Sequence, residues 1–287
     1  MVIGKTVTKV RLRARDALHR GKSALTSVEV QSPSDNVFHC CLHKTASQWI
    51  RRIAKDSRVF KYSGLRDHHY QSSMPGGHDP RPVNERSFDE PFPMRTFVTP
   101  LYIDYRNYRS IPKPESARGF FVTRDPRDIV VSWYFSSLYS HRLMGDLSDV
   151  RGTLSDVDMP TGLSYSIRHL ADFGVFDAQR SWTESGSDPT VVVVRFEDLI
   201  GERSLEVFAD LFNHCRIAIP STELPALLET HSFERLSGRN QGEADPQAHF
   251  RKGVAGDWKN HFDESVREEF HRVTGDLVEA LGYEHAI

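Results

Sequence analysis

Cysteine is scarce in this chain of 287 residues, which contains only Cys40, Cys41 and Cys215. Three cysteines at these spacings form neither a disulfide framework nor a four-ligand zinc site. The adjacent pair lies in an apolar run, where free cysteine usually behaves as a small hydrophobic side chain. We therefore expect the chemistry of the protein to come from other residue types.

Long hydrophobic runs and a strong net charge are also missing. No segment approaches the roughly 18 consecutive apolar residues that a membrane-spanning helix needs. The formal net charge is only -2, and a chain without a basic field lacks the attraction that supports non-specific nucleic-acid binding. We therefore expect a cytoplasmic protein with no transmembrane segment and no nucleic-acid partner, in which any anion site is local.

The first 22 residues differ from the rest, because they carry seven Lys or Arg and one acidic residue. They lack the apolar stretch of a secretory signal. A frayed basic arm is the simplest interpretation, and a helix laid on an anionic membrane surface or an organelle presequence remain alternatives. Since no linker divides the remaining chain, we expect a basic arm over residues 1–30 and a single domain over residues 31–287.

Strand and helix patterns alternate along this domain. Apolar runs typical of strands occupy residues 36–42, 96–103, 119–123 and 190–195. The last run is nearly all valine, so we expect it to be buried on both faces of the sheet. Helical patterns cover about 49–53, 126–140, 164–183, 202–214, 221–230 and 263–281, whereas 64–93 and 145–162 have the composition of loops. This order predicts an α/β domain with a central, mainly parallel sheet flanked by helices.

A polar loop follows the first predicted strand and opens the next helix, with the sequence His43-Lys44-Thr45-Ala46-Ser47-Gln48-Trp49. Such a P-loop-like unit presents backbone N–H groups and the positive end of a helix dipole to an anion. Lys44 adds a charge, and the hydroxyls of Thr45 and Ser47 add donors. On its own the segment is also typical of an ordinary helix-capping turn. It lacks the two glycines of a Walker loop, which disfavours a nucleotide kinase.

A second polar segment follows the strand over 119–123. The Asp125-Pro126 pair predicts a helix start, since Asp suits the N-cap and Pro suits the first helical position. Arg124 at the strand end and Ser132, eight residues later, could both face a phosphate. The alternative is a capped helix in which Arg127 and Asp128 form a solvated face.

A third segment combines two adjacent cations, Arg251 and Lys252, with a flexible Gly253-x-x-Gly256 loop and an aromatic anchor, Trp258. Glycine permits backbone angles that other residues avoid, so this loop can wrap around an anion. All three segments are expected at the carboxyl ends of strands, which is where open α/β sheets bind ligands.

In this order and with comparable separations, the three segments resemble the cytosolic-type sulfotransferases that use 3′-phosphoadenosine-5′-phosphosulfate (PAPS). In that family a Lys-Ser-Gly-Thr-Thr-Trp loop binds the 5′-phosphosulfate. An Arg and a Ser eight residues later bind the 3′-phosphate, and an Arg-Lys-Gly-x-x-Gly-Asp-Trp-Lys segment closes over the donor. Two shorter matches place Phe196 and Phe233 near the adenine. The resemblance implies a donor site made of Lys44, Thr45, Ala46, Ser47, Gln48, Trp49, Arg124, Ser132, Phe196, Phe233, Arg251, Lys252 and Gly253.

The resemblance implies transfer of a sulfuryl group from PAPS to a hydroxyl or amine of a small-molecule, lipid or sugar acceptor. Lys44 would stabilise the leaving phosphate, and no metal is expected, because a sulfuryl group carries less charge than a phosphoryl group. A protein that binds PAPS or its product PAP without catalysis remains an alternative. The family places its catalytic His on the strand before the Arg segment, but residues 97–104 contain no histidine. The base has therefore moved, been replaced or is not needed. His68, His69 and Asp104 are the candidates if it is present, and we select His69 because histidine titrates near neutral pH.

Overall fold

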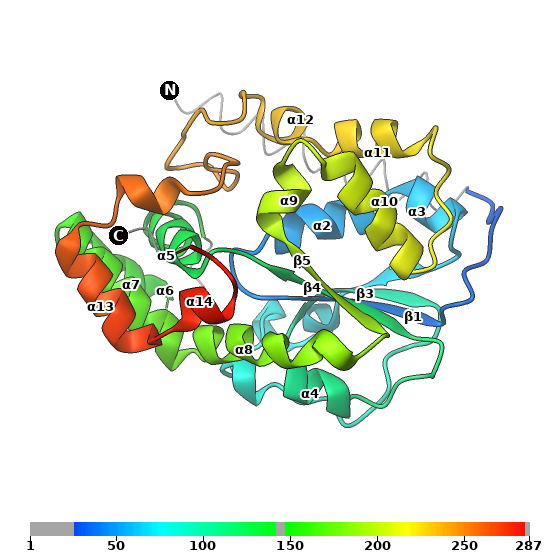
Figure 1. Cartoon of the computed structure of the whole chain (residues 1–287), viewed down its shortest axis with the longest axis horizontal. Helices are drawn as coiled ribbons and strands as arrows, with labels where there is room; N and C mark the ends of the chain where they lie inside the picture. Colours follow the sequence, from blue (N-terminus) through cyan, green and yellow to red (C-terminus); the bar gives the residue numbers. More distant parts are fainter. Residues whose placement is uncertain (1–25, 142–146, 285–287) are drawn as a thin grey trace.

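The computed structural model describes residues 26–141 and 147–284. In this part of the chain, one five-stranded sheet has the order β2-β3-β1-β4-β5, and all neighbouring strands are parallel (Figure 1). The strands are β1 (Asn36–Cys41), β2 (Arg66–His68), β3 (Thr96–Tyr102), β4 (Arg118–Thr123) and β5 (Val191–Arg195). The predicted α/β fold with a parallel sheet is therefore confirmed.

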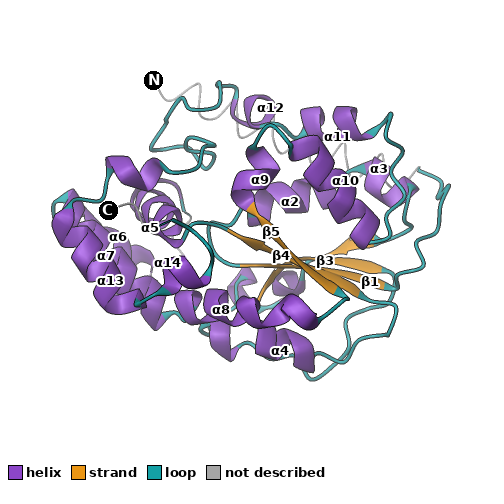
Figure 2. Ribbon diagram, in the orientation of Figure 1, coloured by secondary structure: helices purple, strands orange, loops and turns teal. Residues whose placement is uncertain are grey.

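Helices cover both faces of this sheet (Figure 2). The longer ones are α2 (Ser47–Ala54), α5 (Pro126–Phe135), α6 (Leu147–Ser155), α7 (Met159–Asp172), α10 (Ser204–His214) and α13 (Glu264–Thr274). The shorter ones are α3 (Ser57–Lys61), α4 (Tyr105–Ser110), α8 (Val175–Ser181), α9 (Phe196–Ile200), α11 (Leu224–Thr230), α12 (Phe233–Ser237) and α14 (Leu277–Ala280).

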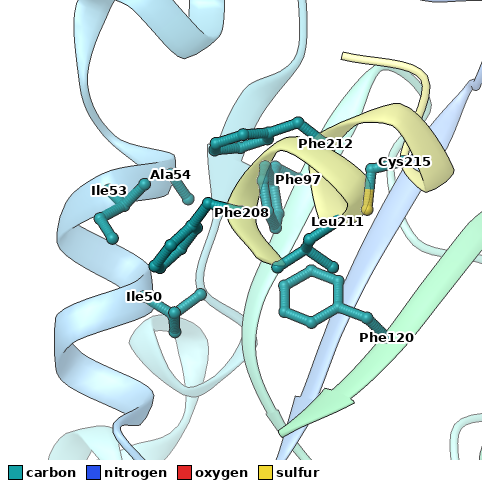
Figure 3. A pocket seen from close by; sticks show the side chains of 9 residues that line it. All are labelled: Ile50, Ile53, Ala54, Phe97, Phe120, Phe208, Leu211, Phe212 and Cys215. Carbon is teal, nitrogen blue, oxygen red and sulfur yellow. The ribbon is translucent and has the colours of Figure 1, made fainter. Parts of the chain in front are cut away.

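Two hydrophobic cores result, one on each face of the sheet. Successive residues of a strand point to opposite faces, so Phe120 joins the core beneath α2 and α10 while Phe121 joins the core beneath α5, α7 and α8. Figure 3 shows a small cavity in the first core, where Ile50 of α2 meets Phe208 of α10. Its lining is apolar apart from the Cys215 thiol, so this cavity belongs to the core and offers no polar chemistry.

The helix that follows β4 begins where the sequence predicts. Pro126 is the first residue of α5, and the Asp125 carboxylate accepts a hydrogen bond from the N–H of Arg127 at 2.9 Å. The helix ends at Phe135, and a π-helical turn over Ser136–Ser140 carries it to the expected end. Local capping chemistry alone is enough to predict this element.

Five other predictions are wrong in part. The single helix expected over 263–281 is divided into α13 and α14 at Gly275, whose φ of 61° is left-handed. The valine strand β5 lies at the edge of the sheet with Val193 42% exposed, because no further strand pairs with it in the described chain. The segment 145–162 contains α6 and the start of α7 rather than a loop. The helix expected over 164–183 is divided into α7 and α8 at Gly174, whose φ of 69° is left-handed and whose Cα faces the side chain of Asn84. The loop over 64–93 includes the short edge strand β2.

The basic arm falls mostly on residues 1–25, which lie outside the described residues. From Thr26 onward the chain runs beside α3, where the N–H of Glu29 donates to the carbonyl of Lys61 at 2.8 Å. Among the described helices, none has the length and apolar character needed to cross a membrane.

Candidate functional site

The register of the sheet brings the predicted segments to one edge. Cys41 of β1 pairs with Tyr102 of β3 and Val122 of β4, and Val122 pairs with Val194 of β5. Four neighbouring strands therefore end at the same level. The loop that contains Lys44 leaves β1 at this level, and Arg124 leaves β4 beside it.

Arg124 joins all three polar segments. Its guanidinium donates to the carbonyl of Lys44 at 3.1 Å and to the carbonyl of Val254 at 3.3 Å. The same group lies 4.5 Å from the ring centre of Phe196 and 3.8 Å from the carboxylate of Asp128. Arg124 is only 8% exposed, and its Nε has no partner among the described residues. A buried guanidinium group with an N–H that lacks a partner is suited to bind an anion.

The loop after β1 is held by its own hydroxyl groups. Thr45 Oγ1 donates to the carbonyl of Leu42 at 3.0 Å and accepts from the N–H of Leu42 at 3.1 Å. Ser47 Oγ lies 2.9 Å from the hydroxyl of Tyr102. These two hydroxyls therefore have internal partners. The N–H groups of Trp49 and Ile50 already donate to the carbonyl of Ala46, so the earlier N–H groups at the start of α2 are the donors that this loop offers to a ligand.

Ala46 adopts a left-handed backbone, with φ of 62° and ψ of 18°, directly before α2. Glycine reaches this region without strain, whereas a Cβ costs roughly 1–2 kcal/mol. The resemblance places glycine at this position, so the chain tolerates alanine here at the cost of a strained turn.

Replacing Ala46 with glycine is therefore expected to stabilise the protein by about 0.5–1 kcal/mol, because relief of strain outweighs the lost methyl contact. Ala209→Gly in α10 serves as the matched control, since a helical alanine loses about 1 kcal/mol on the same change. Urea unfolding of both variants measures the difference. A loss of stability at Ala46 as large as that at Ala209 would contradict the assigned strain.

Lys44 lies in a strongly cationic environment. Burial, followed by the charges of Arg124 and Arg251, lowers the pKa of Lys44 from 10.5 to about 7. Like charges brought together in a partly buried place need a compensating anion. Lysines with such lowered pKa values are also typical of functional sites.

Asp128 fastens the third segment to the second. Its carboxylate accepts the N–H of Gly256 at 2.7 Å and the N–H of Trp258 at 2.9 Å. Arg127 stacks over the Trp258 ring, with 3.8 Å between the guanidinium carbon and the ring centre. Both side chains are buried, so the alternative in which they form a solvated face is wrong.

Arg251 and Lys252 share one carboxylate. Each donates to Asp257 at 2.5 Å, and Asp257 is 2% exposed. Burial raises the pKa of Asp257, but hydrogen bonds from His261 and these two cations outweigh it and leave the pKa well below its usual range. The internal ion pairs orient both cations at the start of the Gly-rich loop.

One of the predicted aromatic residues contacts this loop directly. The ring of Phe233 packs against Gly253, where an added Cβ would lie 2.5 Å from the ring, and Gly253 has a left-handed φ of 72°. Trp49 donates its indole N–H to the carbonyl of His231 at 2.7 Å.

Ser132, the remaining predicted ligand of the 3′-phosphate, lies two turns into α5 and is partly buried.

The candidate base His69 lies elsewhere along the sheet. It follows His68, which pairs with Val98, four residues before the end of β3. Since His69 is one residue further along, it lies roughly 10 Å back from the level at which the strands end, and β3 lies between β2 and β1. Burial and the charge of Arg51 lower the pKa of His69 to about 4. Asp104, another candidate, caps α4 by accepting from Asn107 N–H at 2.8 Å.

Three other histidines respond to the charge of Lys44, namely His43, His141 and His249, and that charge lowers the pKa of each in addition to the larger effect of burial. Sequence reasoning passed over all of them. His43 alone carried a signal, because it directly precedes Lys44 in the first polar loop.

The sequence matches a model of a known protein family. The model described as "Sulfotransferase domain" matches residues 109–282, which include the second and third segments. The chain is 23% identical to "Flavonol sulfotransferase-like" of Flaveria bidentis over 87% of this chain and 83% of that protein. It is 26% identical to "Sulfotransferase 1E1" of Homo sapiens, in a match that covers 53% of this chain and 52% of that protein.

Solved structures share the fold. Mouse sulfotransferase SULT7A1, solved with PAP, gives a TM-score of 0.55 at 16% identity and covers 87% of this chain and 85% of that one. Retinol dehydratase, solved with androsterone and PAP, gives 0.54 at 17% identity, with coverage of 89% and 84%. Because the sulfotransferase model matches more than half of the sequence and the fold agrees, this chain belongs to the sulfotransferase domain family.

Proposed function

We propose that this protein is an enzyme that transfers a sulfuryl group from PAPS to a hydroxyl or amine of a small-molecule, lipid or sugar acceptor. The observation that carries the proposal is the convergence of three cationic loops on Arg124, which contacts the Lys44 loop and the Gly-rich loop directly. An adenine nucleotide with phosphate groups at two ends needs cations of this kind on both sides. The family membership supplies the sulfuryl chemistry.

The donor site would divide its work between these loops. Lys44 and the first N–H groups of α2 would hold the 5′-phosphosulfate, and Arg124, Ser132, Arg251, Lys252 and Gly253 would hold the 3′-phosphate. Trp49, Phe196 and Phe233 would flank the adenine. The remaining members of the predicted donor loop, Thr45, Ala46, Ser47 and Gln48, would act mainly through their backbone. The Nε of Arg124 and the paired cations at Asp257 fit this assignment.

Lys44 would promote the chemical step. As the acceptor oxygen bonds to sulfur and the bond from sulfur to the bridging oxygen breaks, negative charge grows on the 5′-phosphate of PAP. A positioned ammonium stabilises that charge where it develops, in a place that largely excludes water. The same role is filled by cations in phosphoryl transfer.

The proposed function extends to the domain organisation, the location and the acceptor class. We infer a single catalytic domain over residues 31–287 with a basic arm over residues 1–30, working in the cytoplasm on acceptors that carry a free hydroxyl or amine. The names of two relatives, a flavonol sulfotransferase-like protein and a 3-alpha-hydroxysteroid sulfotransferase, refer to hydroxyl-bearing small molecules.

Two measurements on the whole chain test the proposal. Titration calorimetry with PAP is expected to show binding at a single site. Incubation with PAPS labelled in its sulfate, in the presence of phenols, alcohols and amines, is expected to yield a labelled product. Binding without any transfer would favour a protein that senses or carries the nucleotide, and the absence of both would leave the kinase alternative.

A further inference from the structure

The residues assigned so far include no group that accepts the proton of the acceptor hydroxyl. The acceptor O–H must lose its proton as its oxygen bonds to sulfur, and a side chain within reach usually takes it. β3 carries no histidine. His69 follows the short strand β2, which ends well before the level at which β3 ends. The question rests on the proposed function, because only a transferase of this kind needs such a base.

The imidazole of His43 occupies the end of β3. Its ring stacks on Tyr102, the last residue of that strand, with 4.9 Å between centres and 13° between planes. Trp133 and Phe173 meet the same ring edge-on at 5.8 Å and 5.4 Å. Three aromatic contacts from three different elements hold the ring in one place, one residue before Lys44.

Unused polar atoms gather around this ring. Nδ1 of His43 and Nε1 of Trp133 are buried and have no hydrogen-bond partner within the described residues, and Trp133 is 6% exposed. Nδ1 of His141, whose ring lies 5.5 Å from that of Trp133, is in the same condition. Buried polar atoms are nearly always paired, so a shared set of unpaired ones indicates a place for a polar ligand group such as an acceptor hydroxyl.

Burial and the positive charges around His43 keep its imidazole neutral, and so able to accept a proton. Burial, then the charges of Arg86, Lys44 and His169, lower the pKa of His43 to about 3 in the protein without donor. The hydroxyl of Tyr102, whose ring stacks on His43, and the ring of His141, whose pKa the charge of His43 lowers further, are also titratable groups of this region. A neutral imidazole can receive a proton, and the negative charges of bound PAPS raise its pKa toward the working range.

We propose that His43 is the general base of the reaction. The acceptor hydroxyl transfers its proton to a ring nitrogen of His43 while its oxygen bonds to the sulfur of PAPS. The bond from sulfur to the bridging oxygen breaks, and its electron pair stays on the 5′-phosphate of PAP beside Lys44. His141 faces the same region from beyond the π-helical turn, but it lacks the contact with the end of β3 that fixes His43.

Acceptor acidity provides a readout that a structural role would not change. p-Nitrophenol is largely ionised slightly above neutral pH and needs no base, whereas p-cresol has a similar shape and keeps its proton. His43→Asn is expected to lower kcat/KM for p-cresol by about 10²- to 10⁴-fold. The loss with p-nitrophenol is expected to be at least ten times smaller, and the affinity for PAP in calorimetry is expected to stay unchanged.

Companion variants complete the test. His271→Asn, on the exposed side of α13, is the matched control and is expected to retain full activity with both phenols. In His43→Gly, added imidazole is expected to restore transfer to p-cresol, which keeps the test usable if the asparagine variant folds poorly.

Several outcomes would overturn the proposal. An equal loss with both phenols would make His43 structural, and an acidity-dependent loss in His141→Asn or His69→Asn with full activity in His43→Asn would move the base. If the wild-type protein transferred sulfate to none of a panel that adds benzyl alcohol and benzylamine, the proposed function itself would fail, and this inference with it.

Discussion

Lys44→Ala is expected to lower kcat for sulfuryl transfer by about 10²- to 10³-fold, the usual effect of removing one positioned donor from a developing oxyanion. The affinity for PAP should change much less. Burial and the neighbouring charges of Arg124 and Arg251 already disfavour the ammonium of Lys44 before the donor binds, so its contribution to ground-state binding is partly cancelled. Its charge becomes fully useful only when the leaving phosphate gains a second negative charge.

Proton uptake on donor binding gives a second test of Lys44. The pKa of Lys44 is about 7 in the donor-free protein, and bound phosphate groups favour its charged form and so raise the pKa. At about pH 8 donor binding should therefore take up a proton, and affinity should fall as pH rises above about 7. Calorimetry of PAP binding in two buffers with different ionisation enthalpies measures this uptake, which Lys44→Ala should abolish.

Lys55 provides the control for both measurements. It lies at the far end of α2 and pairs with Asp67 at 3.6 Å. Lys55→Ala should keep the turnover and the proton uptake of the wild-type protein. If Lys44→Ala weakened PAP binding strongly and left kcat intact, Lys44 would be a binding residue and the assignment of the leaving-group role would be wrong.

The parts of the fold that depend on neighbouring residues could be predicted from the sequence. The Asp125 cap and Pro126 start one helix correctly because both effects act within one turn. The apolar runs of β1, β3 and β4 were recognisable because strands buried on both faces need no polar residue. The valine run of β5 has the same appearance at the edge of the sheet, since its composition does not record how many neighbours a strand has.

The site was predictable only as far as its motifs are local. The three cationic segments could be read individually, but the carboxylate that joins two of them could not, because Asp128 and the N–H of Trp258 are 130 residues apart. The base shows the same limit. His69 was selected by residue type and loop composition, whereas the position of a histidine relative to Lys44 depends on strand register, which places β2 well short of the strand-end level.

Arg124→Ala should act on donor binding rather than on turnover. The side chain is buried, and its removal takes away a fork with an unused N–H together with the link between the Lys44 loop and the Gly-rich loop. Loss of a desolvated, charge-assisted contact is expected to weaken PAP binding by about 2 kcal/mol or more, roughly 30-fold in Kd. Calorimetry with PAP measures the change, and kcat at saturating PAPS should fall far less than in Lys44→Ala.

Two further variants separate this effect from simple damage to the fold. Arg124→Lys keeps the charge but not the planar fork, so its affinity should lie between those of the wild-type and alanine proteins. Arg203→Ala removes an exposed arginine that pairs with Glu206 on α10 and should leave both constants unchanged. Because Arg124 also faces Asp128 at 3.8 Å, the alanine variant should lose some stability, which thermal unfolding records. Equal losses of turnover in Lys44→Ala and Arg124→Ala, with PAP affinity preserved in both, would contradict the division of roles between the two cations.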